Sequence, residues 1–143
     1  MAVPKICGVE TEFGIFVRGR AESNPISASS VLINAYVQAL GRNGHASPSS
    51  ARVDWDFEDE MPFNDARGAT PADAFPPEIE THLVNAVLTN GARYYVDHAH
   101  PECSTPECGD AFEVVTWDRA AEEILRRSMV EAAKVLGPGE EVG

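Results

Sequence analysis

The sequence predicts an α+β fold in which an antiparallel β-sheet carries helices on one of its faces. Three observations support this class: residues 5–17 alternate between apolar and polar side chains, two β-type runs flank Asn90-Gly91, and two segments have helical periodicity. The resulting order of strand, helix, loop, hairpin and helix is typical of an α+β domain rather than of repeated βαβ units.

The alternation in residues 5–17 predicts one half-buried strand. Its apolar face would consist of Cys7, Val9, Phe13, Ile15 and Val17. Glu10 and Glu12 project side by side from the polar face, where two carboxylates repel each other unless a cation lies between them or one is protonated. Mg²⁺ prefers oxygen ligands, so the pair is a candidate metal site. The alternative is a solvated strand face whose carboxylates pair with Lys or Arg.

A helix is expected after the first strand, because apolar residues recur there at spacings of three and four. Its apolar face would consist of Leu32, Ile33, Tyr36, Val37 and Leu40. Ser27 to Ser30 offer N-caps, and Gly41 lies where the helix would end. Residues 41–77 are rich in Gly, Ser, Pro, Asn and Asp without any periodicity, so we predict an inserted flexible loop there.

Asn90-Gly91 predicts a hairpin with a two-residue type I′ turn, because both positions of that turn need positive φ. On the second strand of this hairpin, Arg93, Tyr95 and Asp97 share one face. Asp97 ends the strand, and a loop is expected to follow. If this strand and the first strand are neighbours in one sheet, several polar side chains could converge on one concave face. They are Glu10, Glu12, Tyr95, Asp97 and Glu102.

The longest helix is predicted to begin near Asp110. Its inner stripe would be formed by Val114, Trp117, Ala121, Ile124, Ser128, Ala132 and Val135. A helix stop is expected at Leu136-Gly137-Pro138-Gly139, after which the chain runs out in acidic residues. Since no later segment completes the architecture, we expect the sequence to be a piece of a longer protein or one half of a cleaved one.

Charge and cysteine content argue against several classes of function. The 11 basic and 23 acidic residues give a net charge of −12, so we expect no nucleic-acid partner, because phosphate binding needs clustered Lys and Arg. No apolar run approaches the ~20 residues of a membrane span. Three cysteines do not make a disulfide framework, which favours a cytoplasmic location. A zinc site is an alternative, with the cramped ligand set His98, His100, Cys103 and Cys108.

Two motifs resemble the Pup ligase and Pup deamidase/depupylase family. Gly8-Val9-Glu10-Thr11-Glu12-Phe13-Gly14 is similar to its first strand, and LTNGARYYVDHAHPE, at residues 88–102, is similar to its central motif. The form VDHAHPE resembles the depupylase, and WDFE at 55–58 and DARG at 65–68 resemble an inserted loop that the ligase lacks. The resemblance implies that residues 1–143 are the N-terminal part of a glutamine synthetase-like catalytic domain, with the inserted loop at about 41–77.

The resemblance also implies roles for individual residues. Asp97 matches the catalytic aspartate, acting as nucleophile or as base. The metal-binding positions are matched by Glu10, Tyr95 and Glu102, with Glu12 as a further ligand. ATP-binding positions are implied for Gly8, Val9, Thr11, Arg93, Ser104 and Thr105. A regulatory loop is implied for Trp55, Asp65 and Arg67.

On this basis we expect an enzyme that uses Mg²⁺ and ATP as cofactors. It would hydrolyse the isopeptide bond between the C-terminal Glu of Pup and a substrate lysine, and it would deamidate the C-terminal Gln of Pup. Its partners would be Pup, pupylated proteins and the remaining C-terminal part of the same enzyme. The alternatives are a Pup–protein ligase, which forms that bond with ATP hydrolysis, and a non-catalytic fragment.

Overall fold

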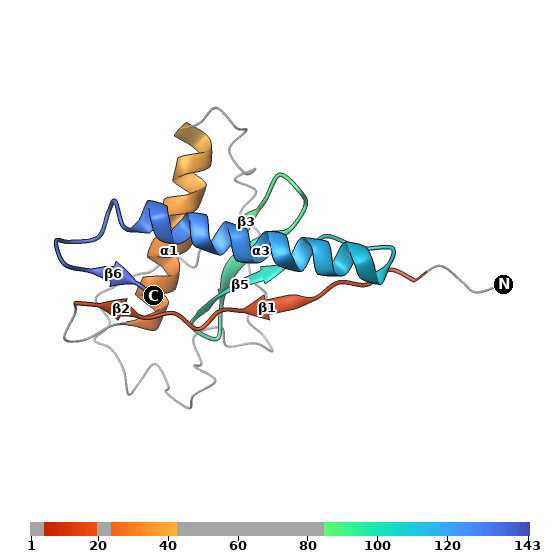
Figure 1. The fold of residues 1–143 in the computed structure, drawn as a ribbon, viewed down its shortest axis with the longest axis horizontal. Coiled ribbons are helices and arrows are strands. Elements are labelled where there is room, and N and C mark those ends of the chain that lie inside the picture. The colour runs from red at the N-terminus through yellow and green to blue at the C-terminus, as the bar shows by residue number, and fades with distance from the viewer. Residues whose placement is uncertain (1–4, 20–23, 43–84) are drawn as a thin grey trace.

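The computed structural model describes residues 5–19, 24–42 and 85–143, and Figure 1 shows how their elements are arranged. In chain order the elements are β1 (Glu10–Glu12), β2 (Val17–Arg18), α1 (Pro25–Arg42), β3 (Asn85–Val87), β4 (Arg93–Asp97), β5 (His100–Ser104), α3 (Ala111–Ala132) and β6 (Glu141–Val142). Trp55, Asp65 and Arg67 of the predicted inserted loop lie outside the described residues.

The main sheet has the strand order β1-β5-β4-β3, and every neighbouring pair is antiparallel. β5 lies between β1 and β4, so Glu102 is the partner of Glu12 on one side and of Tyr95 on the other. A second, two-stranded sheet pairs β2 with β6. The antiparallel sheet expected from the sequence is thus confirmed, with β5 as an additional central strand.

Both helices cover the same face of the main sheet (Figure 1). Ile33 from α1 and Ala121 from α3 pack against Tyr94, Val96 and Cys103 from β4 and β5. Ile33 and Val96 are fully buried, and each contributes about 1.5–3 kcal/mol through its removal from water. This packing confirms the expected α+β class and leaves the opposite face of the sheet to the polar side chains.

The single strand expected over residues 5–17 is divided into an isolated bridge between Cys7 and Cys108, then β1, then β2. β1 ends at Glu12, because the next position of β5 on that side, Pro101, has no N–H to donate to Phe13, and the later β2 pairs with β6. Ile15 and Val17 are buried as expected, whereas Cys7 and Val9 are exposed. The predicted apolar face is therefore right only for its later part.

The first helix begins and ends outside its predicted limits. Asn24 caps it, because the Asn24 Oδ1 accepts a hydrogen bond of 3.1 Å from the Ser27 amide. Pro25 takes the first helical position, where the missing N–H of proline costs nothing. The predicted caps Ser27 to Ser30 lie inside the helix, which also continues through Gly41 to Arg42.

The prediction of a type I′ turn at Asn90-Gly91 is wrong. The Gly91 amide donates to the Leu88 carbonyl, and the Leu88 amide donates to the Ala92 carbonyl, so the loop has three residues rather than two. Only its third residue, Gly91, has positive φ, at 87°. This geometry is a type I turn followed by a left-handed glycine, the usual solution for a three-residue hairpin loop.

The last helix begins where it was predicted, after the N-cap Asp110. Its inner stripe is correct for Ala121, Ser128 and Ala132, which are buried. Val135 is 64% exposed, because the helix ends at Ala132 and Val135 lies beyond it. The acidic C-terminal residues, for which no element was predicted, form β6 and pair with β2.

Candidate functional site

The polar face of the main sheet gathers side chains from three strands. Side chains alternate between the two faces of a strand, so residues of β1, β5 and β4 that are two apart point the same way. The residues on this face include Glu10, Glu12, Arg93, Tyr95, Asp97, His100, Glu102 and Ser104. The convergence that the sequence suggested is therefore present, with β5 bridging the two strands that carry it.

The Tyr95 hydroxyl is the centre of the first cluster. It lies 3.2 Å from Glu10 Oε1 and 3.0 Å from Ser104 Oγ, and it also contacts Glu102 Oε1. Ser104 Oγ donates a further hydrogen bond of 3.0 Å to Glu10 Oε1. Two carboxylates from separate strands thus meet at one phenol oxygen.

Burial governs the protonation of this cluster. Glu102 is only 3% exposed, and its burial raises the pKa of its carboxyl to about 7; the hydrogen bond from Tyr95 opposes this rise, and the charge of Asp97 adds to it. Burial, followed by the hydrogen bond with Glu102, raises the pKa of the Tyr95 phenol. A divalent cation would stabilise the ionised carboxylates, and an all-oxygen donor set suits Mg²⁺.

A second cluster surrounds Glu12. His98 Nδ1 lies 3.2 Å from Glu12 Oε1 and 3.2 Å from Asp97 Oδ2. His100 Nδ1 lies 3.2 Å from the other oxygen of Glu12. The hydrogen bond with Glu12 raises the pKa of His98, although partial burial opposes it. The ligand atoms of Glu12, Asp97 and His98 all lie within 4.8 Å of one another, which is close enough for one shared cation.

The residues that were predicted to bind ATP fall into three places. Arg93 lies on the polar face, where its guanidinium stacks 4.2 Å from the Tyr95 ring centroid and its Nε donates to Asn85 Oδ1 at 2.8 Å. Phosphate oxygens are common partners of a guanidinium in such a position. Ser104 belongs to the Tyr95 cluster.

Gly8, Val9 and Thr105 lie together where the chain enters β1 and leaves β5. The Val9 amide donates to Thr105 Oγ1 at 3.1 Å, and a Cβ atom on Gly8 would come within 3.0 Å of that oxygen. Thr11 points to the helix side, where its hydroxyl donates to Asp118 at 2.8 Å. The Thr11 side chain is therefore not on the face that carries the other predicted residues.

The alternative zinc site is not formed. Cys103 packs in the core beneath the helices, on the face of β5 opposite Glu102, and Cys108 is fully buried. His98 and His100 both face Glu12. The four predicted zinc ligands consequently point to different places.

The sequence did not reveal β5, nor the roles of His98, His100 and Ser104 as neighbours of the carboxylates. The alternation of His100, Glu102 and Ser104 was a usable signal, but Pro101 argued against a central strand, since proline lacks a ladder N–H. The Pro101 carbonyl accepts from the Phe13 amide just beyond the end of β1, so the proline nitrogen also faces the side on which β1 has ended. The proline is tolerated there.

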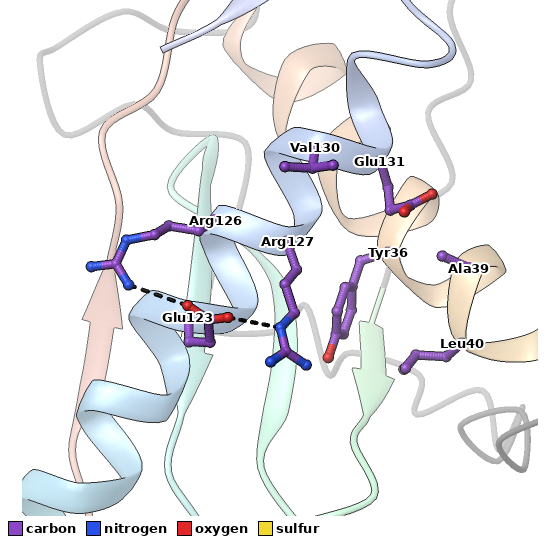
Figure 2. Close-up of a pocket in the computed structure, with 8 residues that line it drawn as sticks. All are labelled: Tyr36, Ala39, Leu40, Glu123, Arg126, Arg127, Val130 and Glu131. Atoms are coloured by element: carbon purple, nitrogen blue, oxygen red, sulfur yellow. Dashed lines mark hydrogen bonds and ion pairs between the residues drawn. The ribbon is translucent and has the colours of Figure 1, made fainter. Parts of the chain in front are cut away.

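A further hollow of about 320 Å³ lies on the helix side, between α1 and α3 (Figure 2). Three of its charged groups bind each other: Glu123 accepts from Arg127 at 2.8 Å and from Arg126 at 3.3 Å. Tyr36, Leu40 and Val130 supply its apolar lining. This hollow lacks the converging carboxylates of the polar face, so the polar face is the better candidate for a site.

Comparison with known protein families shows which family the chain belongs to. The family model described as Pup-ligase protein matches residues 5–142. The chain belongs to the Pup-ligase protein family. Among curated members, a depupylase of Acidothermus cellulolyticus is 42% identical over 134 residues, which are 90% of this chain and 25% of that protein. A Pup deamidase/depupylase of Mycobacterium tuberculosis is 41% identical over 93% of this chain and 26% of its own length.

A relative that carries the ligase name matches a smaller part of the chain. A Pup–protein ligase of Nocardioides sp. is 47% identical over 53 residues, or 36% of this chain. The chain spans about a quarter of the length of the depupylases it matches. In the part of the chain that the structure describes, neither helix combines the length and the apolar character that crossing a membrane requires.

Proposed function

We propose that this chain is the N-terminal part of a depupylase and Pup deamidase with a glutamine synthetase-like catalytic domain. The observation that carries the proposal is the meeting of Glu10 and Glu102 at the Tyr95 hydroxyl, with Asp97 on the same face. The similarity to relatives named depupylase, which extends over at least 90% of this chain, supports cleavage rather than ligation.

The cofactors of the proposed enzyme are Mg²⁺ and ATP. Glu10, Tyr95 and Glu102 would hold a magnesium ion, and Glu12 would be a further ligand. Bound there, the ion would supply charge neutralisation for phosphate and carbonyl oxygens. The nucleotide side of the site would be formed by the side chains of Arg93, Ser104 and Thr105. The backbone of Gly8, Val9 and Thr11 would complete it.

In the proposed reaction Asp97 acts on a side-chain amide carbonyl. Its carboxylate either attacks the carbonyl carbon or takes a proton from the water that attacks it. In both cases water adds across the C–N bond, and the Pup glutamate and the amine of the lysine, or ammonia, are released. The Asp97 side chain is 17% exposed, so it is reachable from the polar face while held by its neighbours.

The partners of this enzyme would be Pup, pupylated proteins and the rest of the same polypeptide. With a net charge of −12, this segment is poorly suited to bind an acidic modifier, so the surface for Pup would lie mostly on the remaining part. We place the enzyme in the cytoplasm, where its three free cysteines would stay reduced.

The test is Asp97→Asn in the full-length enzyme, with cleavage of a Pup-conjugated substrate as the readout. We expect a loss of about 10²- to 10⁴-fold, the usual effect of removing a general base or nucleophile. Asp110→Asn is the matched control, because asparagine also caps a helix and position 110 lies away from the polar face. Cleavage by the Asp97→Asn variant at the wild-type rate would contradict the proposed function.

A Pup–protein ligase is the second candidate, favoured by the match of 53 residues to a protein of that name. A ligase and a depupylase differ in the direction of the reaction. Conjugation of Pup to a test protein in the presence of ATP, without cleavage of the conjugate, would favour the ligase.

A further inference from the structure

The turn between β4 and β5 adopts an unfavourable backbone conformation. Asp97 and His100 are paired, so His98 and Ala99 alone make the turn, with φ of 43° and 69°. This is the geometry of a type I′ turn, which normally carries Asn or Gly at both positions. Left-handed residues with a Cβ atom are costly and persist where surrounding contacts determine them.

Contacts with the first helix hold this turn in place. Ala99 is 1% exposed, and its carbonyl accepts a hydrogen bond of 2.8 Å from the Ser29 hydroxyl in α1. Ser29 is itself fully buried. The backbone of the turn is therefore fixed to a rigid element, and with it the direction of the Cα–Cβ bond of His98.

From this position His98 faces two carboxylates at once. Its Nδ1 is 3.2 Å from both Glu12 Oε1 and Asp97 Oδ2. Ionised carboxylates only accept hydrogen bonds, so Nδ1 must carry the hydrogen and share it between them. His100 engages the other Glu12 oxygen, so both oxygens of Glu12 are held by imidazoles.

We infer that His98 is a positioning residue, which holds the carboxylate of Asp97 in its reactive orientation against Glu12. The inference rests on the proposed function of Asp97. Glu12, whose two oxygens are held by His98 and His100, is the anchor of this arrangement. Fixing a reacting group matters because a misplacement of about 1 Å can cost 10²-fold in rate.

The test compares two substitutions in the full-length enzyme. His98→Gly keeps the left-handed backbone but removes the donor, whereas His98→Asn keeps the backbone and places an amide N–H near the position of Nδ1. We expect His98→Gly to lower kcat about 10- to 100-fold, the effect of losing a hydrogen bond to a charged group, with little change in KM for the conjugate. His98→Asn should recover most of that loss.

Two outcomes would overturn the inference. Wild-type kcat in His98→Gly would mean that His98 only shapes the turn. Loss of one bound Mn²⁺ in both variants, counted by paramagnetic resonance, would mean that His98 is a metal ligand shared with Glu12 and Asp97. An unchanged Mn²⁺ count together with recovery by asparagine supports positioning.

Asp97→Asn, made in the same experiment, separates this inference from the proposed function. If Asp97→Asn abolishes cleavage while His98→Gly does not affect it, only the positioning role fails. If Asp97→Asn retains cleavage, the proposed function fails and the positioning role fails with it. If both single changes lower kcat, the double variant should be no slower than Asp97→Asn alone, because His98 acts through Asp97.

Discussion

The Tyr95 hydroxyl has one hydrogen to donate and three oxygen neighbours, so it cannot satisfy all of them. Ser104 supplies a second hydrogen, which goes to Glu10. Glu102, buried beside the same oxygen, is the carboxyl whose pKa rises to about 7. At the scale of single residues, the Glu102 carboxyl therefore binds its proton more tightly than an isolated glutamate would.

This protonation predicts how stability changes with pH. Folding raises the pKa of Glu102 from 4.5 to about 7, so the folded state binds the proton more tightly, and the contribution of Glu102 to stability falls as the pH rises through that interval. Glu102→Gln cannot ionise. In the absence of divalent cations, the Tm of the Glu102→Gln variant should exceed that of the wild type at pH 8. The difference between the two Tm values should be smaller at pH 5.

Calorimetry of both proteins at the two pH values checks this prediction. Adding Mg²⁺ at pH 8 should raise the Tm of the wild type more than that of Glu102→Gln, because a bound ion stabilises the ionised carboxylate. A Tm difference that stays constant between pH 5 and pH 8 would show that Glu102 does not titrate in this way.

At the scale of elements, α3 begins with two reciprocal hydrogen bonds. Asp110 accepts from the Glu113 amide at 2.9 Å, and the Glu113 carboxylate accepts from the Gly109 amide at 2.7 Å. Asp110→Ala should lower the free energy of unfolding by about 1 kcal/mol, the usual cost of losing an N-cap. Asp110→Asn should stay close to wild type in the same urea titration, and equal stability of the alanine variant would contradict the role of the cap.

Local signals predicted some elements well. The start of the long helix near Asp110 and the alternation of Tyr94 and Val96 with Tyr95 depend only on nearby residues, and the structure agrees with both. The two hairpin loops were not predictable in this way. The type I′ turn is at His98 and Ala99, which carry no turn signature, because the contact with Ser29 in α1 holds it there.

Part of the candidate site was likewise predictable from nearby residues, and part depends on tertiary structure. The alternation of β1 and β4 indicated which carboxylates share a face, since that follows from a period of two. The neighbours of those carboxylates depend on β5, which lies between the two strands and brings in Ser104 and His100. Strand order is a tertiary property, so residues far apart in sequence could not be matched beforehand.

At the scale of the whole molecule, several apolar side chains have no cover in the described part of the chain. Phe112 is 80% exposed, Ile6 73%, Val135 64% and Val130 62%. Phe112 and Val130 lie near opposite ends of α3, so these side chains are separate exposed groups rather than one patch, and each is a position that further polypeptide would cover. The depupylases that this chain resembles are about four times its length, and the remainder of such a protein is a suitable partner.

We therefore expect the 143-residue chain alone to bind a hydrophobic dye and to cleave no Pup conjugate. Co-expression with the remaining part of the enzyme should reduce dye fluorescence and produce cleavage. Phe112→Ser in the isolated chain should also lower the fluorescence, without loss of helical circular dichroism, because Phe112 packs against little of the chain. Cleavage by the isolated chain would show that it needs no further segment.

The side chains on one face of β5 pack in the core, and those on its other face belong to the acidic cluster around Tyr95. Cys103 lies under the helices, while Glu102 and Ser104 point to Tyr95. A deletion of one residue here would exchange the two sets, sending a carboxylate into the hydrocarbon interior and a thiol to the polar side. Mutational drift in this segment is thus restricted to replacements that keep its length, and a shortened strand would lose folding and chemistry together.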